Sequence, residues 1–337
     1  MGKCLVIGST VCDVMIYLDA LPGRQGDAHI KKQVMSLGGC AFNVVNILHH
    51  LGVEYDFILP VGTGIYGTFV KDNLYKLGIQ TPISLDGANG CCYCFVESDG
   101  ERTFLSDHGV EYSFDPAWLD GYDLSQYDYV YICGLEVEED TGQALVDWLK
   151  TCGRPVIFAP GPRGNLIPEK RMVQLLALSP ILHLNEQEAM LLAQVSDVER
   201  AICALYAKTQ QLIIVTKGSD GALAFDGAWH EAPSFSADVV DTIGAGDSHV
   251  GAMMAALATD KTIAESLAFA NRVASYVVAT QGVHLSTPIY KELKNLLNNR
   301  KRPITRYIEK APKSCRLWNL FLFTSSLNIF IPWQIGF

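Results

Sequence analysis

A glycine-rich turn that ends in an aspartate, in the stretch DTIGAGD, carries the clearest chemical signal in this chain. Gly244, Ala245 and Gly246 have little or no side chain, so their backbone N–H groups can approach an anion closely. A helix of small residues begins close to Asp247, and its N-terminus adds about half a positive charge. A carboxylate beside an anion site is unfavourable unless its charge is used, for instance to accept a proton from an attacking hydroxyl. The pattern predicts phosphoryl transfer with Asp247 as base, although Asp is also an ordinary helix N-cap.

A second group of residues in the N-terminal part favours a polyol ligand. Gly38 and Gly39 precede a helix that carries Asn43, in the stretch SLGGCAFNVVNILHHLG. This layout allows close backbone approach and directs a side-chain amide at the ligand. Asp13 lies where the first strand passes into an inserted ribbon. Asn43 as a surface amide and Asp13 as a turn former are the alternatives, but together with Asp247 they indicate a binding site.

A third pair indicates a magnesium site. Asn185 and Glu188, in ILHLNEQEAMLL, are three residues apart at the start of a helix and therefore share one face. Their oxygens are hard ligands that suit Mg²⁺ with its retained water molecules. The alternative is a capping box, in which Asn185 caps the helix and Glu188 reaches back to the cap residue. Both roles can hold at once.

The elements that must position these residues alternate along the chain. Strand-like and helix-like segments follow one another in the order YDFILPV, FVKDNLYKLG, YVYICG, TGQALVDWLKTCG, PVIFAP, EKRMVQLLALS, ILHLN, EQEAMLLAQV, VERAICALYAKT and QLIIVTKG. This order predicts an α/β fold with a mostly parallel central sheet and helices on both faces. Two β-rich insertions, near residues 12–37 and 89–112, break the alternation. We expect them to pair as a separate small sheet that serves as a lid.

Composition limits the class of partner. The chain has 337 residues and a formal net charge of −10, which disfavours nucleic acid and anionic membranes. It opens without a signal-peptide pattern and has ten cysteines, so a reduced cytoplasmic location is expected. The cluster CCYC, Cys91 to Cys94, lacks a second pair at metal-binding spacing and is interpreted as small residues in a strand.

The stretch DTIGAGD closely resembles the C-terminal signature of the ribokinase-like (PfkB-type) family of carbohydrate kinases, with agreement at seven successive positions. GG-x-x-x-N and N-x-x-E also look like motifs of that family. The resemblance covers residues 3–295 and implies a kinase domain over residues 1–300. It implies that Asp247 is the catalytic base, that the N–H groups of Gly244 to Asp247 form the anion hole, and that the sugar is bound by Asp13, Gly38, Gly39, Asn43 and Glu136.

The resemblance also implies where nucleotide and ions bind. ATP and Mg²⁺ are the implied cofactors, with Glu188 holding Mg²⁺ through water. The implied nucleotide-binding residues are Asn185, Thr216, Lys217, Gly218, Gly221 and, near the adenine, Asn271. A monovalent cation such as K⁺ is implied behind the anion hole, held by Asp241 and the carbonyls of Ile243, Thr280 and Gly282. Gly64 and Ala159 depart from the family pattern, which puts the substrate in doubt but not the activity.

Three functions stay open at this point. The first is an ATP-dependent kinase that phosphorylates a hydroxyl of a monosaccharide or related polyol. The second is a nucleoside kinase of the adenosine or pseudouridine type, for which CCYCF and Tyr112 would supply an apolar wall. The third is a sugar or nucleotide sensor without turnover, which would need neither a base nor a metal motif. Four basic residues are candidate contacts for a phosphorylated or acidic sugar, although surface charge on a ribbon is the commoner reason for such residues: Arg24, Lys31, Lys32 and Arg102. A homodimer through the lid is expected, because a lid made of small sheets has edges to cover.

Two stretches invite other interpretations. GTGIYG, Gly62 to Gly67, has the glycine spacing of a dinucleotide-binding turn, but it follows the second strand of the fold, so we interpret it as a tight β–α turn. Residues 301–337 begin with a basic run and end in the apolar LWNLFLFTSSLNIFIPWQIGF. Polar residues within that run weaken a membrane-spanning interpretation, and a tail packed on the body or poorly ordered is expected. The tail has no predicted role.

Overall fold

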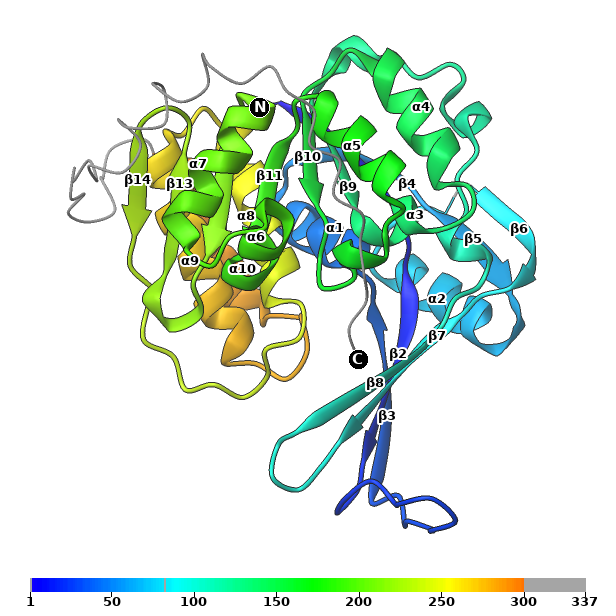
Figure 1. The fold of residues 1–337 in the computed structure, drawn as a ribbon. Helices are drawn as coiled ribbons and strands as arrows, with labels where there is room; N and C mark the ends of the chain where they lie inside the picture. The colour runs from blue at the N-terminus through cyan, green and yellow to red at the C-terminus, as the bar shows by residue number, and fades with distance from the viewer. Residues whose placement is uncertain (1, 82, 300–337) are drawn as a thin grey trace.

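The central sheet decides where the candidate residues meet. The computed structural model describes residues 2–81 and 83–299, and in that part eight strands form one sheet in the order β14-β13-β12-β11-β10-β9-β1-β4 (Figure 1). Six neighbouring strands, β12 to β4 in that order, are parallel. Their bounds are β1 Lys3–Ile7, β4 Glu54–Ile58, β9 Tyr127–Cys133, β10 Val156–Ala159, β11 Ile181–Asn185, β12 Ile213–Thr216, β13 Ala222–Phe225 and β14 Trp229–Ala232. The prediction of a mostly parallel sheet is confirmed.

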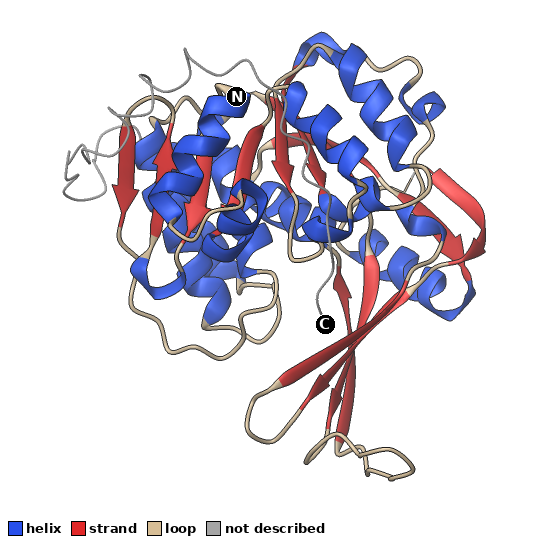
Figure 2. Cartoon of the chain, in the orientation of Figure 1, coloured by secondary structure: helices blue, strands red, loops and turns tan. Residues whose placement is uncertain are grey.

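Helices cover both faces of the sheet (Figure 2). One face packs against α1 (Cys40–Leu51), α8 (Ala245–Leu257), α9 (Ile263–Val278) and α10 (Thr287–Asn298), and the other against α4 (Gly142–Cys152), α5 (Glu169–Ala177), α6 (Glu186–Ala193) and α7 (Val198–Thr209). Strand β1 shows why helices are needed on both faces. Cys4 and Val6 belong to the first apolar cluster, whereas Leu5 and Ile7 belong to the second. Successive side chains point to opposite faces, so a strand without polar alternation must be covered on both.

The sheet is not parallel at one end, where β13 and the edge strand β14 run antiparallel to their neighbours. No pattern in the sequence predicted β14. Its four residues, Trp229–Ala232, show intermediate or full exposure except the last, and such a short half-exposed strand has little apolar content to mark it.

The two insertions form a second sheet, as predicted. Its order is β3-β2-β7-β8, with bounds β2 Val11–Tyr17, β3 Lys32–Gly38, β7 Cys91–Val96 and β8 Arg102–Asp107. β2 and β7 pair in parallel, which joins the two insertions, and the sheet extends away from the body as a ribbon (Figure 1). Cys91 and Cys94 are buried in β7, so the expected strand is confirmed for the cysteine cluster.

GTGIYG lies outside the central sheet. The expected single strand YDFILPV is divided into β4 and β5 (Pro60–Thr63), and β5 pairs with β6 (Ile83–Ala88) in a separate two-stranded sheet. α2 (Gly64–Lys76) follows directly. A Cβ on Gly62 would lie 2.6 Å from the Gly87 carbonyl oxygen, so this glycine serves close backbone packing. The expectation of one strand was wrong because Leu59, between β4 and β5, is buried like its neighbours and leaves the apolar run unbroken.

The predicted tail, residues 301–337, lies outside the described residues. Among residues 2–81 and 83–299, no helix combines the length and the apolar character that crossing a bilayer requires.

Candidate active site

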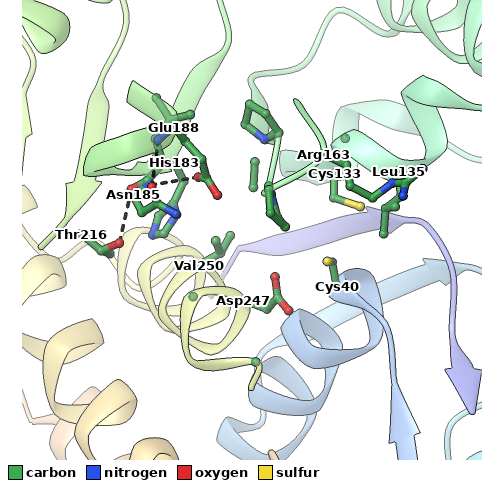
Figure 3. A pocket seen from close by; sticks show the side chains of 18 residues that line it. Cys40, Cys133, Leu135, Arg163, His183, Asn185, Glu188, Thr216, Asp247 and Val250 are labelled. Atoms are coloured by element: carbon green, nitrogen blue, oxygen red, sulfur yellow. Dashed lines mark hydrogen bonds between the residues drawn. The ribbon is translucent and has the colours of Figure 1, made fainter. Parts of the chain in front are cut away.

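A cavity of about 200 Å³ opens at the carboxyl ends of β9, β10, β11 and β12, beside the first turn of α8 (Figure 3). Parallel strands all end at this edge, so residues that follow different strands meet there. The lining includes the predicted residues Asn185, Glu188, Thr216, Gly244, Gly246 and Asp247. It also includes residues that the sequence did not indicate: Cys40, Cys133, Arg163 and His183.

The anion-hole turn has the predicted form. Gly244 is the residue before α8 and has φ of 68°, a conformation that favours glycine. A Cβ on Gly244 would lie 2.3 Å from Val283 Cγ1 and 3.0 Å from Asn43 Nδ2. Asp247 stands in the first helical turn, and no side chain caps α8. Asp247 therefore does not act as an ordinary N-cap. The Ala245 N–H donates to the Thr242 carbonyl over 3.3 Å, whereas within the described residues the N–H groups of Gly246 and Asp247 have no acceptor.

Asp247 lies against two side chains of α1. Asn43 Nδ2 donates a hydrogen bond to Asp247 Oδ2 over 2.9 Å, across 204 residues of sequence. The Cys40 side chain lies beside this carboxylate at the cavity (Figure 3). Burial raises the pKa of Asp247, and the Asn43 hydrogen bond and the nearby Cys40 thiol oppose that rise. The result is an oriented carboxylate with a proton affinity above that of a free Asp, which suits a base.

The predicted sugar-binding residues meet on the lid side of Asp247. A Cβ on Gly38 would lie 2.0 Å from Asp13 Oδ2, so the Asp13 carboxylate rests against this glycine. Gly39 is the residue before α1, has φ of 100° and lies against the Ser9 backbone. Burial, with the charges of Asp247 and Asp241, raises the pKa of Asp13 to about 7. Three carboxylates therefore lie near one another at the base of the lid.

Buried acceptors without a partner mark this region. Asn43 Oδ1, Ser9 Oγ and Thr10 Oγ1 have no hydrogen-bond partner within the described residues. Since leaving buried polar atoms unpaired costs free energy, such atoms near a binding site are matched by a ligand or by water. Hydroxyl groups of a polyol would satisfy them.

Glu136, which is predicted to bind the sugar, is almost completely buried. It stands on α3 (Gly134–Glu138), is 1% exposed, and accepts hydrogen bonds from the Ser9 N–H over 2.8 Å and the Cys133 thiol over 2.8 Å. Burial raises its pKa. Both carboxylate oxygens already have protein partners, so a direct contact between Glu136 and a sugar stays a prediction.

Asn185 and Glu188 form the capping box that the sequence allowed. Asn185 Oδ1 accepts from the Glu188 N–H over 2.8 Å, and Glu188 Oε2 accepts from the Asn185 N–H over 2.9 Å. Both residues also line the cavity. Burial and the charge of Asp247 raise the pKa of Glu188, and a nearby cation would reverse that effect. This set of oxygens fits Mg²⁺, with the second Glu188 oxygen available to a metal-bound water.

The other nucleotide-side residues form the turn after β12. Thr216 ends the strand and lines the cavity, and Gly218 and Gly221 have φ of 56° and 91°. A Cβ on Gly221 would lie 2.2 Å from the Ala232 carbonyl oxygen. Lys217 closes the turn by donating its N–H to the Gly221 carbonyl over 2.8 Å. Of these four residues only Thr216 lines the cavity, so nucleotide binding by Lys217, Gly218 and Gly221 stays a prediction.

Asn271 belongs to a buried chain of hydrogen bonds. Its Nδ2 donates to the Ala232 and Pro233 carbonyls over 2.9 and 3.0 Å, so its Oδ1 faces His249 Nε2 at 3.1 Å. His249 Nδ1 in turn lies 2.8 Å from His183 Nε2. Since Asn271 can only accept at Oδ1, His249 carries its proton on Nε2 and His183 donates from Nε2. The chain joins α9 and α8 to the cavity wall at His183.

These two histidines are expected to make stability fall in acid. Burial lowers the pKa of His249 to about 4, and burial with the nearby His249 lowers the pKa of His183 well below its usual value. The unfolded chain binds protons near 6.5 and the folded chain does not, so stability is complete above that pH and declines below it. Between about pH 7 and about pH 5, His249 alone should cost about 2 kcal/mol of unfolding free energy.

Urea unfolding at the two pH values tests this. His249→Gln should reduce the loss in acid, whereas His29→Gln, at an exposed lid position, should leave it unchanged. An equal acid loss in wild type and His249→Gln would contradict the buried neutral state of His249.

Comparison with known proteins agrees with the geometry. The model of the pfkB family carbohydrate kinases matches residues 1–289. The chain belongs to this family. It is an ATP-dependent carbohydrate kinase, as the motifs predicted.

This pfkB-family kinase is similar to several sugar kinases. It is 35% identical to the uncharacterized sugar kinase YegV of Escherichia coli over 285 residues, which cover 82% of this chain and 89% of that protein. It is 28% identical to the ATP-dependent ribose-1-phosphate kinase of Halopiger xanaduensis, with coverage of 84% and 94%. The fold matches the ribokinase of Arabidopsis thaliana complexed with ribose and ATP, with a TM-score of 0.74 at 22% identity and coverage of 89% and 100%.

Proposed function

We propose that this kinase transfers the γ-phosphoryl group of ATP to a hydroxyl of a neutral monosaccharide or a closely related polyol. The observation that carries the proposal is the hydrogen bond between Asn43 and Asp247. Asn43 Nδ2 orients the proposed base, whereas Asn43 Oδ1 is a buried acceptor that has no partner among the described residues. A sugar hydroxyl that donates to Oδ1 would place the molecule within reach of the base.

The roles of the residues follow from this arrangement. The acceptor oxygen bonds to the γ-phosphorus while its proton passes to an Asp247 oxygen, and the bond from the γ-phosphorus to the bridging oxygen breaks to release ADP. The N–H groups of Gly244 to Asp247 donate to the phosphoryl oxygens as charge builds up there. Glu188 would hold Mg²⁺ through water, and the ion would supply positive charge beside the phosphates of ATP. Asp13 accepts hydrogen bonds from hydroxyl groups of the sugar and thereby fixes which hydroxyl faces Asp247.

The charges at the site favour a neutral acceptor over an anionic one. Asp13, Asp241 and Asp247 lie near one another, as their mutual effect on the pKa of Asp13 shows. The nearby Arg102 is already paired with Asp241. Of the other basic candidates, Lys31 pairs with Asp19, Lys32 lies over the Tyr17 ring with its Nζ 5.3 Å from the ring centroid, and Arg24 is exposed. A sugar phosphate or sugar acid would meet repulsion from the three carboxylates.

An ATP-consumption screen tests the proposal. It compares neutral pentoses and hexoses with sugar acids, sugar phosphates and nucleosides, with Asp247→Asn as the blank for background hydrolysis. Turnover with a neutral sugar, and much less with its phosphate or acid, is the expected result. Preference for an anionic sugar would refute the neutral assignment, and no ATP loss with any compound would favour a sensor.

The nucleoside alternative has less support from the lid. Tyr112, part of the expected wall for a nucleobase, is 5% exposed and lies against His108 with ring centroids 4.3 Å apart. Tyr93 uses its hydroxyl to bond that of Tyr66 over 2.8 Å. Both rings therefore already have protein partners.

Asp13 should give substrate binding a distinct pH dependence. Hydroxyl donors favour its carboxylate, whose pKa is about 7 in the free protein, so the KM for the sugar should rise about tenfold per pH unit below that value. Asp13→Asn should weaken binding and remove this inflection. Steady-state kinetics between about pH 5.5 and about pH 8.5 measure both effects.

Stability provides the control for Asp13. The pKa of Asp13 is about 7 in the folded protein and 3.8 in the unfolded chain. Ionisation of this carboxylate therefore lowers the stability of the folded state as the pH rises from about 4 towards 7. Asp13→Asn should therefore unfold at a higher temperature than wild type at about pH 8. A variant with lost affinity and lower stability would point to damage to the lid instead.

A homodimer through the lid stays a prediction. Phe104 and Leu105 of β8 are 51% and 57% exposed, and Val34 of β3 is 37% exposed. An exposed apolar lid surface is consistent with a covering partner. Cytoplasmic location and the domain limits likewise stay predictions.

A further inference from the structure

One ion pair connects the lid to the anion-hole segment. Arg102, the first residue of β8, donates from Nη1 to Asp241 Oδ1 over 2.8 Å. The side chains are 20% and 4% exposed. Asp241 stands six residues before Asp247 in DTIGAGD. The pair therefore links two parts of the chain that are 139 residues apart and that both border the substrate region.

Asp241 holds two loops together beneath the anion hole. Its Oδ1 also accepts from the Ile243 N–H over 2.8 Å, and its Oδ2 accepts from the Gly282 N–H over 3.1 Å. The next residue, Val283, lies against the Cα of Gly244, where a Cβ would come within 2.3 Å of its Cγ1. A shift of the Asp241 carboxylate would therefore move the backbone that leads into the anion hole.

The residues around Asp241 do not fit the monovalent cation that the family resemblance implied. Both carboxylate oxygens are occupied, one by a guanidinium N–H and a backbone N–H and the other by a second backbone N–H. A cation that binds Asp241 Oδ1 would have to displace Arg102. The guanidinium already supplies a full positive charge at hydrogen-bond distance.

We propose that Arg102 is a built-in cation for the Asp241 position, so that this kinase needs no K⁺. Arg102 is a positioning residue: it acts through Asp241 on the anion hole and does so only when the lid lies over the site. The loop that contains Gly282 receives a second lid contact, because the side-chain amide of Gln281 hydrogen-bonds to the Tyr17 hydroxyl of β2. Lid contact and anion-hole geometry are thereby coupled.

Electrostatics gives the reason for a fixed positive charge here. Asp241 is 3% exposed, and a buried carboxylate that loses its partner is strongly destabilising. Asp13 and Asp247 add negative charge nearby, and the phosphates of ATP add more. Removal of the guanidinium should leave a small, negatively charged space in which K⁺ or a guanidinium ion from solution can bind.

Thermal unfolding tests the proposal without any assumption about substrate. Wild type should unfold at the same temperature in KCl and in choline chloride of equal ionic strength. Arg102→Ala should be less stable in choline chloride and regain stability in KCl or guanidinium chloride at low, non-denaturing concentration. Arg200→Ala, at an exposed position of α7, should behave like wild type in every salt. Stabilisation of wild type by K⁺ over choline, or an Arg102→Ala variant that neither salt restores, would overturn the proposal.

Kinetics test the positioning role, and this part rests on the proposed function. Arg102→Ala should lower kcat by about a hundredfold with little change in sugar KM, and Arg102→Lys should restore part of it. With Asp241→Asn already present, Arg102→Ala should have little further effect. A raised KM with unchanged kcat would instead make Arg102 a sugar contact. If no sugar is turned over, the proposed function fails, and the thermal comparison still decides the cation question. If Arg102→Ala does not fold, Arg102→Lys and the salt independence of wild type decide it.

Discussion

Asp247→Asn is expected to lower kcat by about a thousandfold while sugar and ATP bind nearly as in wild type. The amide keeps the size of the carboxylate and one oxygen, so the shape of the site is retained, but it cannot accept a proton from the acceptor hydroxyl. Positioning supplies much of phosphoryl-transfer catalysis, so some turnover should remain from the anion hole and the bound metal. Single-turnover kinetics and calorimetric titration with sugar and ATP measure the two effects separately.

A matched acid-to-amide change separates chemistry from general charge effects. Asp238 is exposed on the segment that precedes the anion hole, and Asp238→Asn removes the same charge away from the reacting atoms. It should keep wild-type turnover. Should Asp247→Asn retain the wild-type rate, Asp247 is not the base.

Gly244→Ala is expected to lower kcat by about a hundredfold, because it disturbs the anion hole and the base together. The added Cβ would lie 2.3 Å from Val283 Cγ1 and 3.0 Å from Asn43 Nδ2. Movement of Asn43 would weaken its 2.9 Å hydrogen bond to Asp247 Oδ2. The positive φ of 68° adds backbone strain for any residue with a Cβ. Steady-state turnover at saturating substrates is the measurement.

Gly153→Ala is the control for strain alone. Gly153 follows α4 with φ of 63°, and nothing lies within 4 Å of its added Cβ. Gly153→Ala should lower the free energy of unfolding by about 1 kcal/mol and leave the activity unchanged. If Gly244→Ala loses only comparable stability and stays fully active, the close packing at Gly244 has no role in catalysis.

Local sequence patterns predicted much of this site, because the residues concerned are close together in the chain. Gly244, Gly246 and Asp247 share one turn, and DTIGAGD contains the end of the loop that leads into α8, whose small residues are visible without a structure. The capping box of Asn185 and Glu188 spans one helical turn and has its own spacing. Glycines at forced conformations and residues at helix starts depend on local backbone sterics, so they leave a signal in the sequence.

Contacts between distant segments left no such signal. Nothing in the sequence indicates that Cys40 and Asp247 line one cavity, or that His183 and His249, 66 residues apart, share a hydrogen bond. Arg102 was one of four basic lid residues with no feature to single it out. In each case the chemistry of the side chain permits many partners, and only the packing of helices against the sheet selects one.

The sequence by itself therefore determined the fold class and the family, and it predicted a base and an anion hole within one turn, since strand–helix alternation and the motif residues are local properties. The tertiary structure alone decided how the base is oriented, which acceptors remain unpaired, and what stands beside Asp241. Those properties depend on where α1, α8 and the lid meet at the ends of the parallel strands. That meeting is set by the burial of apolar surface throughout the two cores, to which residues from the whole chain contribute and which no short pattern records.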